Sequence, residues 1–307
     1  MTSVDSASLL IEGPWQHRFV TANGARFHVA VAGDQDAPLV LLLHGVPQLW
    51  WAWRHQLPVL AAAGYRVAAM DLRGTGGSDK PPQGYDVPTL AADVAGVVRS
   101  LGAGSAVVVG SGTGGDVAWA TAAYHPEVVR ALGVLGAPHP LDALAIPRTP
   151  PGPAAAAVLA YAQLPSLPER SMVRGDLVDR MLTHWGGVPG LPGREASATY
   201  RRAVRVPFAA HSQLELLRWL VRSTPRPDGR RYRAVLRAAR PVPVLQVHGL
   251  RDGLRPASSA ALRSTTAARP YRLELVHAAG HYLTDQAPGL VGELLVDWLT
   301  EVDALSP

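Results

Sequence analysis

The chain has 307 residues, of which 48% are hydrophobic and 17% charged; this composition is typical of a globular protein and excludes a disordered one. The net charge is +5, but the basic residues are spread along the chain and Lys80 is the only lysine, so we expect no nucleic-acid partner. The absence of cysteine excludes disulfides, thiolate zinc sites and a cysteine nucleophile.

The sequence contains no segment that predicts a membrane span or a secretory signal. The apolar run around Ala154–Leu164 is too short to cross a bilayer. Residues Met1–Glu12 lack a basic start followed by an apolar stretch. We therefore expect a cytoplasmic protein without a membrane partner.

The first elements in the chain are two short strands, Arg18–Thr21 and Arg26–Ala32, which Asn23-Gly24 joins into an antiparallel hairpin. Short apolar runs bounded by Gly or Pro follow, as is typical of buried parallel strands: Leu39–Leu43, Arg66–Met70, Ala106–Val109, Leu132–Leu135, Val244–Val247 and Tyr271–Val276. Helical patterns alternate with them: Trp53–Ala63, Thr89–Leu101, Gly115–His125, Ser258–Thr266 and Gly289–Glu301. This alternation predicts an α/β fold with a mostly parallel sheet and helices on both faces.

The strand pattern stops between Leu141 and Ala239, where a Pro-rich start is followed by helical sequence. We predict an α/β core of residues 1–140 and 240–307 and a helical cap of residues 141–239. Such an insertion lies over the carboxyl ends of the strands, where open α/β sheets bind ligands.

Within the predicted core, the motif His44-Gly45-Val46-Pro47 directly follows the strand Leu39–Leu43. A turn there would direct backbone N–H groups toward the carboxyl edge of the sheet, as an oxyanion hole requires. With the runs Trp53–Pro58 and Asp71–Pro81, this motif resembles the epoxide hydrolase and haloalkane dehalogenase branch of the α/β-hydrolases. The resemblance extends from Gly13 to Leu299 apart from the middle of the cap, and it implies an eight-stranded sheet.

The run Gly110-Ser111-Gly112-Thr113-Gly114-Gly115 lies between a predicted strand and a predicted helix, with the spacing of a nucleophile elbow. In the family the middle residue is Asp or Ser, and here it is Gly112. The resemblance implies that the backbone N–H groups of Val46 and Thr113 form the oxyanion hole. Because dehalogenases have Trp directly after the nucleophile, Thr113 argues against dehalogenation.

Two further catalytic positions of the family are filled by Asp252 and His281, which follow the last two predicted strands. A histidine that a carboxylate orients is a general base near neutral pH. Epoxide hydrolases hold the epoxide oxygen with two cap tyrosines, and Tyr161 and Tyr200 are the candidates here. Trp185 is a third candidate for contact with the substrate.

These motifs leave several interpretations open. His281 and Asp252 could activate water without a covalent intermediate, which is the interpretation we favour, or the protein could bind a small ligand without catalysis. Ser111 could replace the nucleophile, or the chain could be a variant of an Asp enzyme that Gly112→Asp restores. We expect a small apolar molecule as the partner, with no metal site and no cofactor. A homodimer is left open.

Overall fold

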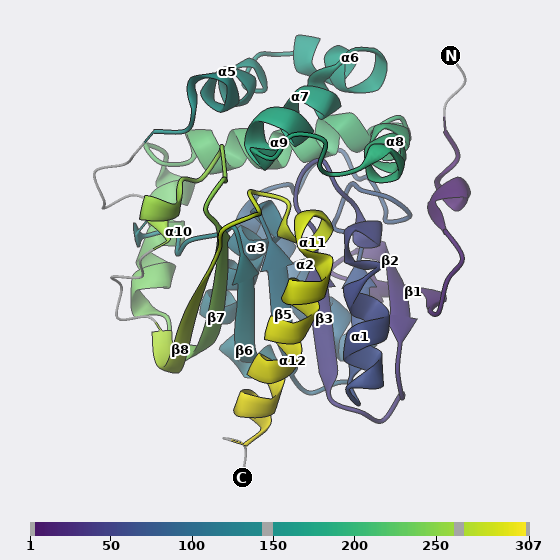
Figure 1. Ribbon diagram of the computed structural model, residues 1–307, viewed down its shortest axis with the longest axis vertical. Helices are drawn as coiled ribbons and strands as arrows, with labels where there is room; N and C mark the ends of the chain where they lie inside the picture. Colours follow the sequence, from purple (N-terminus) through teal and green to yellow (C-terminus); the bar gives the residue numbers. More distant parts are fainter. Residues whose placement is uncertain (1–3, 143–149, 261–266, 305–307) are drawn as a thin grey trace.

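The computed structural model describes residues 4–142, 150–260 and 267–304, which contain one eight-stranded sheet of order β1-β2-β4-β3-β5-β6-β7-β8 (Figure 1). β2 runs antiparallel to both of its neighbours, and the other neighbouring pairs are parallel. The strands are β1 (Gln16–Ala22), β2 (Ala25–Ala32), β3 (Leu39–Leu43), β4 (Arg66–Met70), β5 (Ala106–Ser111), β6 (Val129–Leu135), β7 (Val242–Gly249) and β8 (Ala267–Val276). The predicted hairpin and the mostly parallel sheet are thus confirmed.

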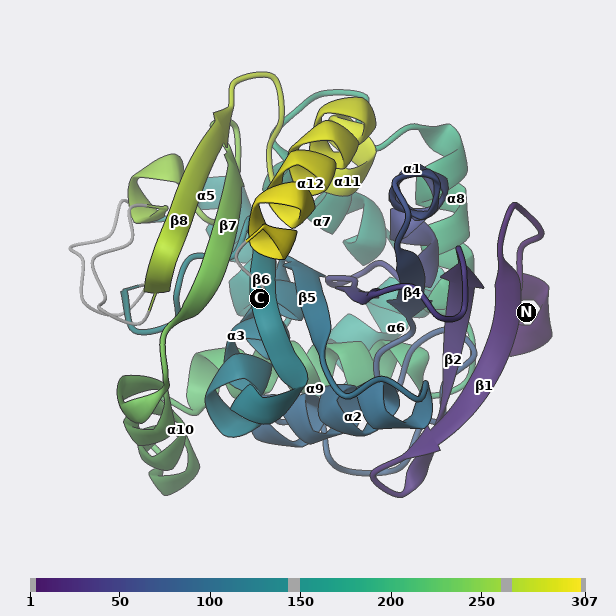
Figure 2. The same ribbon diagram turned by 90° about the horizontal axis from the view of Figure 1, so that it is seen from below.

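Helices cover both faces of this sheet (Figure 2). On one face lie α1 (Gln56–Ala62) and α12 (Pro288–Asp303), with the short α11 (Leu283–Gln286) before α12. On the other face lie α2 (Val87–Ser100) and α3 (Thr113–Tyr124). Successive strand residues point to opposite faces; in β3, Val40 and Leu42 belong to one buried cluster and Leu39, Leu41 and Leu43 to the other.

The segment between β6 and β7 is helical where it is described. Its elements are α5 (Pro153–Tyr161), α6 (Leu167–Arg174), α7 (Leu177–Gly186), α8 (Arg194–Ala203), α9 (Ala209–Arg222) and α10 (Pro227–Ala238). Helices α5 to α9 form a layer over the carboxyl end of the sheet, whereas α10 packs beside the sheet against α3 (Figure 1). Among the described residues, no helix has the length and apolar composition of a membrane span.

Two predicted helices differ from the structure. The helix predicted over Trp53–Ala63 begins later, because α1 starts at Gln56. A separate 3-10 helix, Trp50–Trp53, precedes it and ends at the first residue of the predicted stretch. Pro58 lies in the first turn of α1, where its missing N–H has no helical partner to lose. The helix expected over Ser258–Thr266 falls mostly on residues 261–266, which lie outside the described residues; before them a 3-10 helix spans Ala257–Ser259.

Candidate functional site

The sharp turn between β5 and α3 consists of Gly112, whose φ of +54° and ψ of −121° are rarely adopted by residues with a side chain. Its N–H donates to the carbonyl of Leu135 (2.8 Å), and its carbonyl accepts from the N–H of Gly115 (3.0 Å) and of Asp116 (3.3 Å). These bonds connect the turn to β6 and to the first turn of α3. Gly112 therefore lies at the carboxyl edge of the sheet, as the elbow spacing predicts.

The neighbouring glycines are required by close packing. A Cβ on Gly110 would lie 2.3 Å from the carbonyl oxygen of Gly114, and a Cβ on Gly114 would lie 2.5 Å from the carbonyl oxygens of Leu43 and His44. A Cβ on Gly115 would lie 2.3 Å from Cβ of Ala137. Because none of these contacts allows a side chain, the motif cannot shift by one residue.

His281 and Asp252 form a buried pair beside this turn. Nδ1 of His281 lies 2.8 Å from Oδ2 of Asp252, and the two residues are 3% and 6% exposed. The other carboxylate oxygen, Oδ1, accepts from the N–H of Leu254 (2.9 Å) and of Arg255 (2.7 Å). With the Nδ1 proton directed at the carboxylate, Nε2 of the imidazole carries the lone pair that can accept a proton.

That Nε2 atom faces the elbow. A Cβ built on Gly112 would lie 3.0 Å from Nε2 of His281 and 3.6 Å from its Cε1. The structure thus brings together three residues, Gly112, Asp252 and His281, that are separated by up to 169 positions in the sequence. His248 also lies near Asp252 (3.9 Å), but burial lowers the pKa of its imidazole and its Nε2 hydrogen-bonds the carbonyl of Arg255 (2.7 Å).

The two residues expected at the oxyanion hole lie in contact. The N–H of Val46 donates to the hydroxyl oxygen of Thr113 (3.2 Å). The N–H of Thr113 is the first of α3, where helical N–H groups have no partner within the helix. A Cβ on Gly45 would lie 3.4 Å from this nitrogen, so the turn after β3 packs directly against the elbow. The motif predicts a role only for the backbone of Thr113, so the contact of its hydroxyl with Val46 could not be predicted from the sequence.

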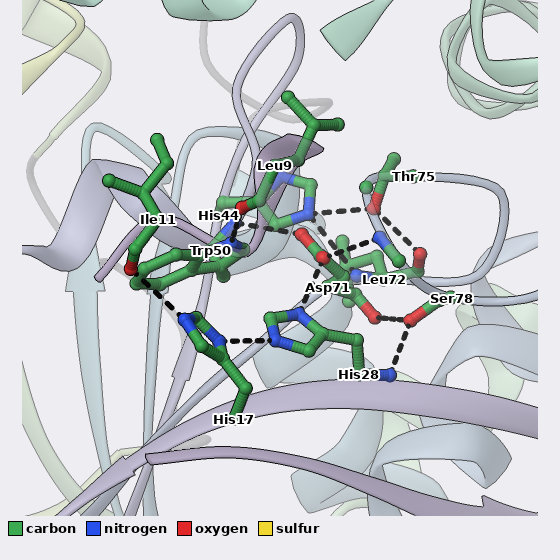
Figure 3. A network of polar contacts seen from close by, with 12 residues as sticks. Leu9, Ile11, His17, His28, His44, Trp50, Asp71, Leu72, Thr75 and Ser78 are labelled. Atoms are coloured by element: carbon green, nitrogen blue, oxygen red, sulfur yellow. Dashed lines mark hydrogen bonds and ion pairs between the residues drawn. The ribbon is translucent and has the colours of Figure 1, made fainter. Parts of the chain in front are cut away.

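A network of polar contacts around Asp71 and His44 holds the turn after β3 in place (Figure 3). Asp71 accepts the N–H of Trp50 at Oδ1 (2.9 Å) and contacts Nδ1 of His28 at Oδ2 (2.8 Å). His28 in turn contacts His17 (2.9 Å). Burial alone would raise the pKa of the Asp71 carboxyl, but the hydrogen bond from His28, electrostatic interaction with His28 and His44, and the hydrogen bond from the N–H of Trp50 outweigh it and hold that pKa below its usual value. His44, the first residue of the turn, accepts the N–H of Leu72 (3.2 Å).

The three cap residues expected at the substrate occupy different surroundings. The ring of Trp185 lies 6.3 Å from that of His281 in a T-shaped arrangement, so this side chain forms part of the wall around His281. The hydroxyl of Tyr200 donates to Oδ2 of Asp285 (2.6 Å). Burial, followed by the charge of Asp285, raises the pKa of this hydroxyl well above its usual value. The hydroxyl of Tyr161 contacts the carbonyl of Leu167 within the cap (3.4 Å).

A cavity of about 240 Å³ lies between the elbow helix, the loop after β7 and helices α9 and α10. Thr113 and Asp116 line it from α3, and Leu254 and Arg255 from the loop that carries Asp252. No sequence motif predicts a role for Asp116 or Arg255. Their only signals are an acidic residue in the first turn after the elbow and an arginine three residues after Asp252.

Comparisons with known proteins identify the family of this chain. Residues 38–288 match the family described as the alpha/beta hydrolase fold. The AB hydrolase superfamily protein YfhM of Bacillus subtilis is 33% identical, over 92% of this chain and 97% of that protein. Epoxide hydrolase A of Mycobacterium tuberculosis is 32% identical, over 93% of this chain and 98% of that protein.

Solved structures give the same result in three dimensions. The crystal structure of epoxide hydrolase A from Mycobacterium thermoresistibile is similar with a TM-score of 0.73 and 28% identity, over 93% of this chain and 98% of that one. An epoxide hydrolase from an endophytic Streptomyces has a TM-score of 0.75 and 26% identity, over 95% and 97% of the two chains. The chain therefore belongs to the α/β-hydrolase family, in its epoxide-hydrolase-like branch.

Proposed function

We propose that this protein hydrolyses a small apolar substrate without a covalent intermediate, with Gly112 at the position of the nucleophile and His281 as the general base. The observation that carries this proposal is the position of Nε2 of His281, 3.0 Å from the point where Cβ of residue 112 would lie. A water oxygen cannot lie at that point itself, which is one bond length from Cα of Gly112, but a water farther from Cα, in the space of the missing side chain, would be within hydrogen-bonding distance of Nε2. Glycine thus leaves room for the attacking water where related enzymes have a carboxylate or hydroxyl.

The reaction proposed for an epoxide substrate uses only groups of this chain. Nε2 of His281 accepts a proton from water, and the water oxygen forms a bond to one epoxide carbon while the C–O bond breaks. The N–H groups of Val46 and Thr113 donate to the resulting oxyanion. For this, the N–H of Val46 exchanges its present acceptor, the hydroxyl oxygen of Thr113, for the oxyanion. The imidazolium returns its proton to that oxyanion, which gives a diol. Asp252 holds the imidazole in the required tautomer and stabilises its charged form.

An oxygen-isotope experiment tests this mechanism directly. In a single turnover with excess protein in ¹⁸O-labelled water, direct attack places ¹⁸O in the first product molecule. A covalent ester on an enzyme carboxylate would instead give an unlabelled first product. We use styrene oxide as the first substrate, because the most similar relatives include epoxide hydrolases. His281→Ala should lower turnover by about 10²–10⁴-fold; undiminished turnover of this variant would disprove the role of His281.

A second candidate function is ligand binding without catalysis. The observation that favours it is the enclosure of His281, which is only 3% exposed and packs against the edge of Trp185. Binding alone predicts saturable association of the ligand that persists in His281→Ala, with no conversion over hours.

A serine-directed phosphonate distinguishes hydrolysis through Ser111 from the two functions above, because it would label Ser111 only if Ser111 were a nucleophile. Ser111 is part of β5, and the side chain of a strand residue stands on a face of the sheet rather than at the turn that follows. We therefore expect no labelling of Ser111. Gly112→Asp tests whether a carboxylate at the elbow creates a covalent route, which would appear as an unlabelled first product in the isotope experiment.

A further inference from the structure

The cavity beside the elbow contains an ion pair between a buried aspartate and a partly buried arginine, in a mostly apolar wall. Nη2 of Arg255 donates to Oδ2 of Asp116, and Asp116 is only 5% exposed. Apolar side chains make up most of the remaining lining, among them Pro138, Leu159, Leu217, Trp219, Leu220 and Leu254.

The pair connects the two halves of the candidate site. Asp116 lies one helical turn after Gly112, and residues four apart on a helix share a face, with side chains inclined toward its N-terminus. Arg255 donates its backbone N–H to Asp252 (2.7 Å) and a guanidinium N–H to the carbonyl of Gly136 (3.3 Å). A polar group of a ligand bound next to this pair would therefore lie close to the elbow.

Stability alone does not account for the pair. Moving both charges out of water costs free energy that their attraction often fails to offset, and apolar replacements of buried pairs are frequently neutral or stabilising. The pair also retains hydrogen-bonding capacity: within the described residues, Oδ1 of Asp116 has no hydrogen-bond partner, and the Arg255 side chain is 20% exposed. The hydroxyl of Tyr232, whose side chain lines the same cavity, is likewise buried without a partner among the described residues.

We propose that the Asp116–Arg255 pair is the specificity element of this cavity and selects an apolar molecule with a neutral group that both donates and accepts a hydrogen bond, such as a hydroxyl or carboxamide. Such a group donates to Oδ1 of Asp116 and accepts from the guanidinium of Arg255. A carboxylate would face the like charge of Asp116, and an ammonium would face the like charge of Arg255, whereas a neutral group meets neither repulsion. This assignment depends on the proposed function for the location of the reaction, but the recognition itself requires no turnover.

The volume of the cavity sets the size of suitable probes. At about 30 Å³ for each liquid water molecule, about 240 Å³ corresponds to roughly eight waters. We choose 2-phenylethanol and ethylbenzene, which differ only by a hydroxyl group. Neither can be hydrolysed, so their binding is measured independently of the reaction, by calorimetry.

Wild-type protein should bind 2-phenylethanol at least about tenfold more tightly than ethylbenzene, because hydrogen bonds to charged groups are the stronger ones. The double variant Asp116→Leu/Arg255→Met removes both charges together and should reduce this ratio to about one while ethylbenzene still binds. The matched control is Asp179→Leu/Arg201→Met, which removes an exposed ion pair elsewhere in the cap and should leave the ratio unchanged.

Three results would overturn the proposal: equal binding of the two probes by wild-type protein, an unchanged ratio in the Asp116/Arg255 double variant, or an effect of the same size in the control. If the double variant does not fold, wild-type protein still decides the question. Binding of 3-phenylpropionate or 2-phenylethylammonium more tightly than 2-phenylethanol would contradict a neutral ligand. His281→Ala should lose turnover and keep the ratio, so the specificity element and the general base can fail separately.

Discussion

Replacing Gly112 by alanine tests the elbow and the proposed water position in one variant. The backbone of Gly112, with φ +54° and ψ −121°, is a conformation that disfavours a side chain. Holding alanine in such a conformation costs about 1–3 kcal/mol of folding free energy. The lower backbone entropy of unfolded alanine offsets about 0.4–1 kcal/mol of this cost. We therefore expect a net loss between about 0 and 2.6 kcal/mol, with about 1.3 kcal/mol at the midpoints of the two ranges, or a few degrees in Tm for a chain of this length.

The added methyl group should also abolish the reaction. Its carbon would lie 3.0 Å from Nε2 of His281 and would crowd the lone pair that, in the proposed mechanism, accepts a proton from the attacking water. The imidazole cannot retreat freely, because Asp252 holds Nδ1 at 2.8 Å and the edge of Trp185 packs against the ring. Turnover should fall by at least about 10²-fold, the range associated with loss of a positioned general base.

The assays are thermal and urea denaturation for stability, and turnover of styrene oxide for activity. Gly24→Ala is the matched control, since its φ is +73° and a Cβ there would meet no atom within 4 Å. The control should lose stability through its backbone alone and retain full turnover. If Gly112→Ala were as stable as wild type and as active, both the elbow geometry and the water position at residue 112 would be refuted.

Three further predictions follow from individual side chains. Burial lowers the pKa of His139 from 6.5 to about 4, so its neutral form stabilises the fold above pH 6.5; at about 1.36 kcal/mol for each pH unit, up to roughly 3 kcal/mol is lost as the pH falls from 6.5 to 4. Denaturation of His139→Phe should show a smaller loss over this pH interval, and an identical pH dependence would contradict the prediction. Tyr200→Phe should cost about 1–3 kcal/mol, because Asp285 loses its hydroxyl donor at 2.6 Å; a large fall in turnover without a loss of stability would instead place Tyr200 at the substrate. Asp252→Asn should preserve the fold but lower turnover by about 10⁴-fold if the effect equals that in serine proteases, since the amide favours the wrong tautomer of His281; turnover near the wild-type level would show that the pair is structural only.

The local strand and helix patterns of the sequence were sufficient to predict an α/β fold with a mostly parallel sheet, and the resemblance of its motifs to epoxide hydrolases implied the α/β-hydrolase fold. The order of the elbow, Asp252 and His281 also follows from the motifs, each of which directly follows a strand. Parallel strands end at one edge of the sheet, so residues at these positions meet there. Helix limits were less accurate where the local pattern was ambiguous. The helix predicted over Trp53–Ala63 begins only at Gln56, and the proline at position 58 lies in its first turn. The limits of the cap, residues 141–239, stay a prediction.

Only the tertiary structure decided which side chains interact within the site. The sequence offered Tyr200 as a substrate contact, but a buried hydroxyl must find a hydrogen-bond partner, and packing supplies Asp285, which is 85 positions away. Likewise, nothing local indicates that Asp116 pairs with Arg255, 139 positions apart, because each looks like an ordinary charged residue in a helix or loop. The distance between Nε2 of His281 and the elbow is likewise decided only by the tertiary structure. It depends on the relative positions of β5, β7 and β8, which long-range packing sets and which no short run of residues encodes.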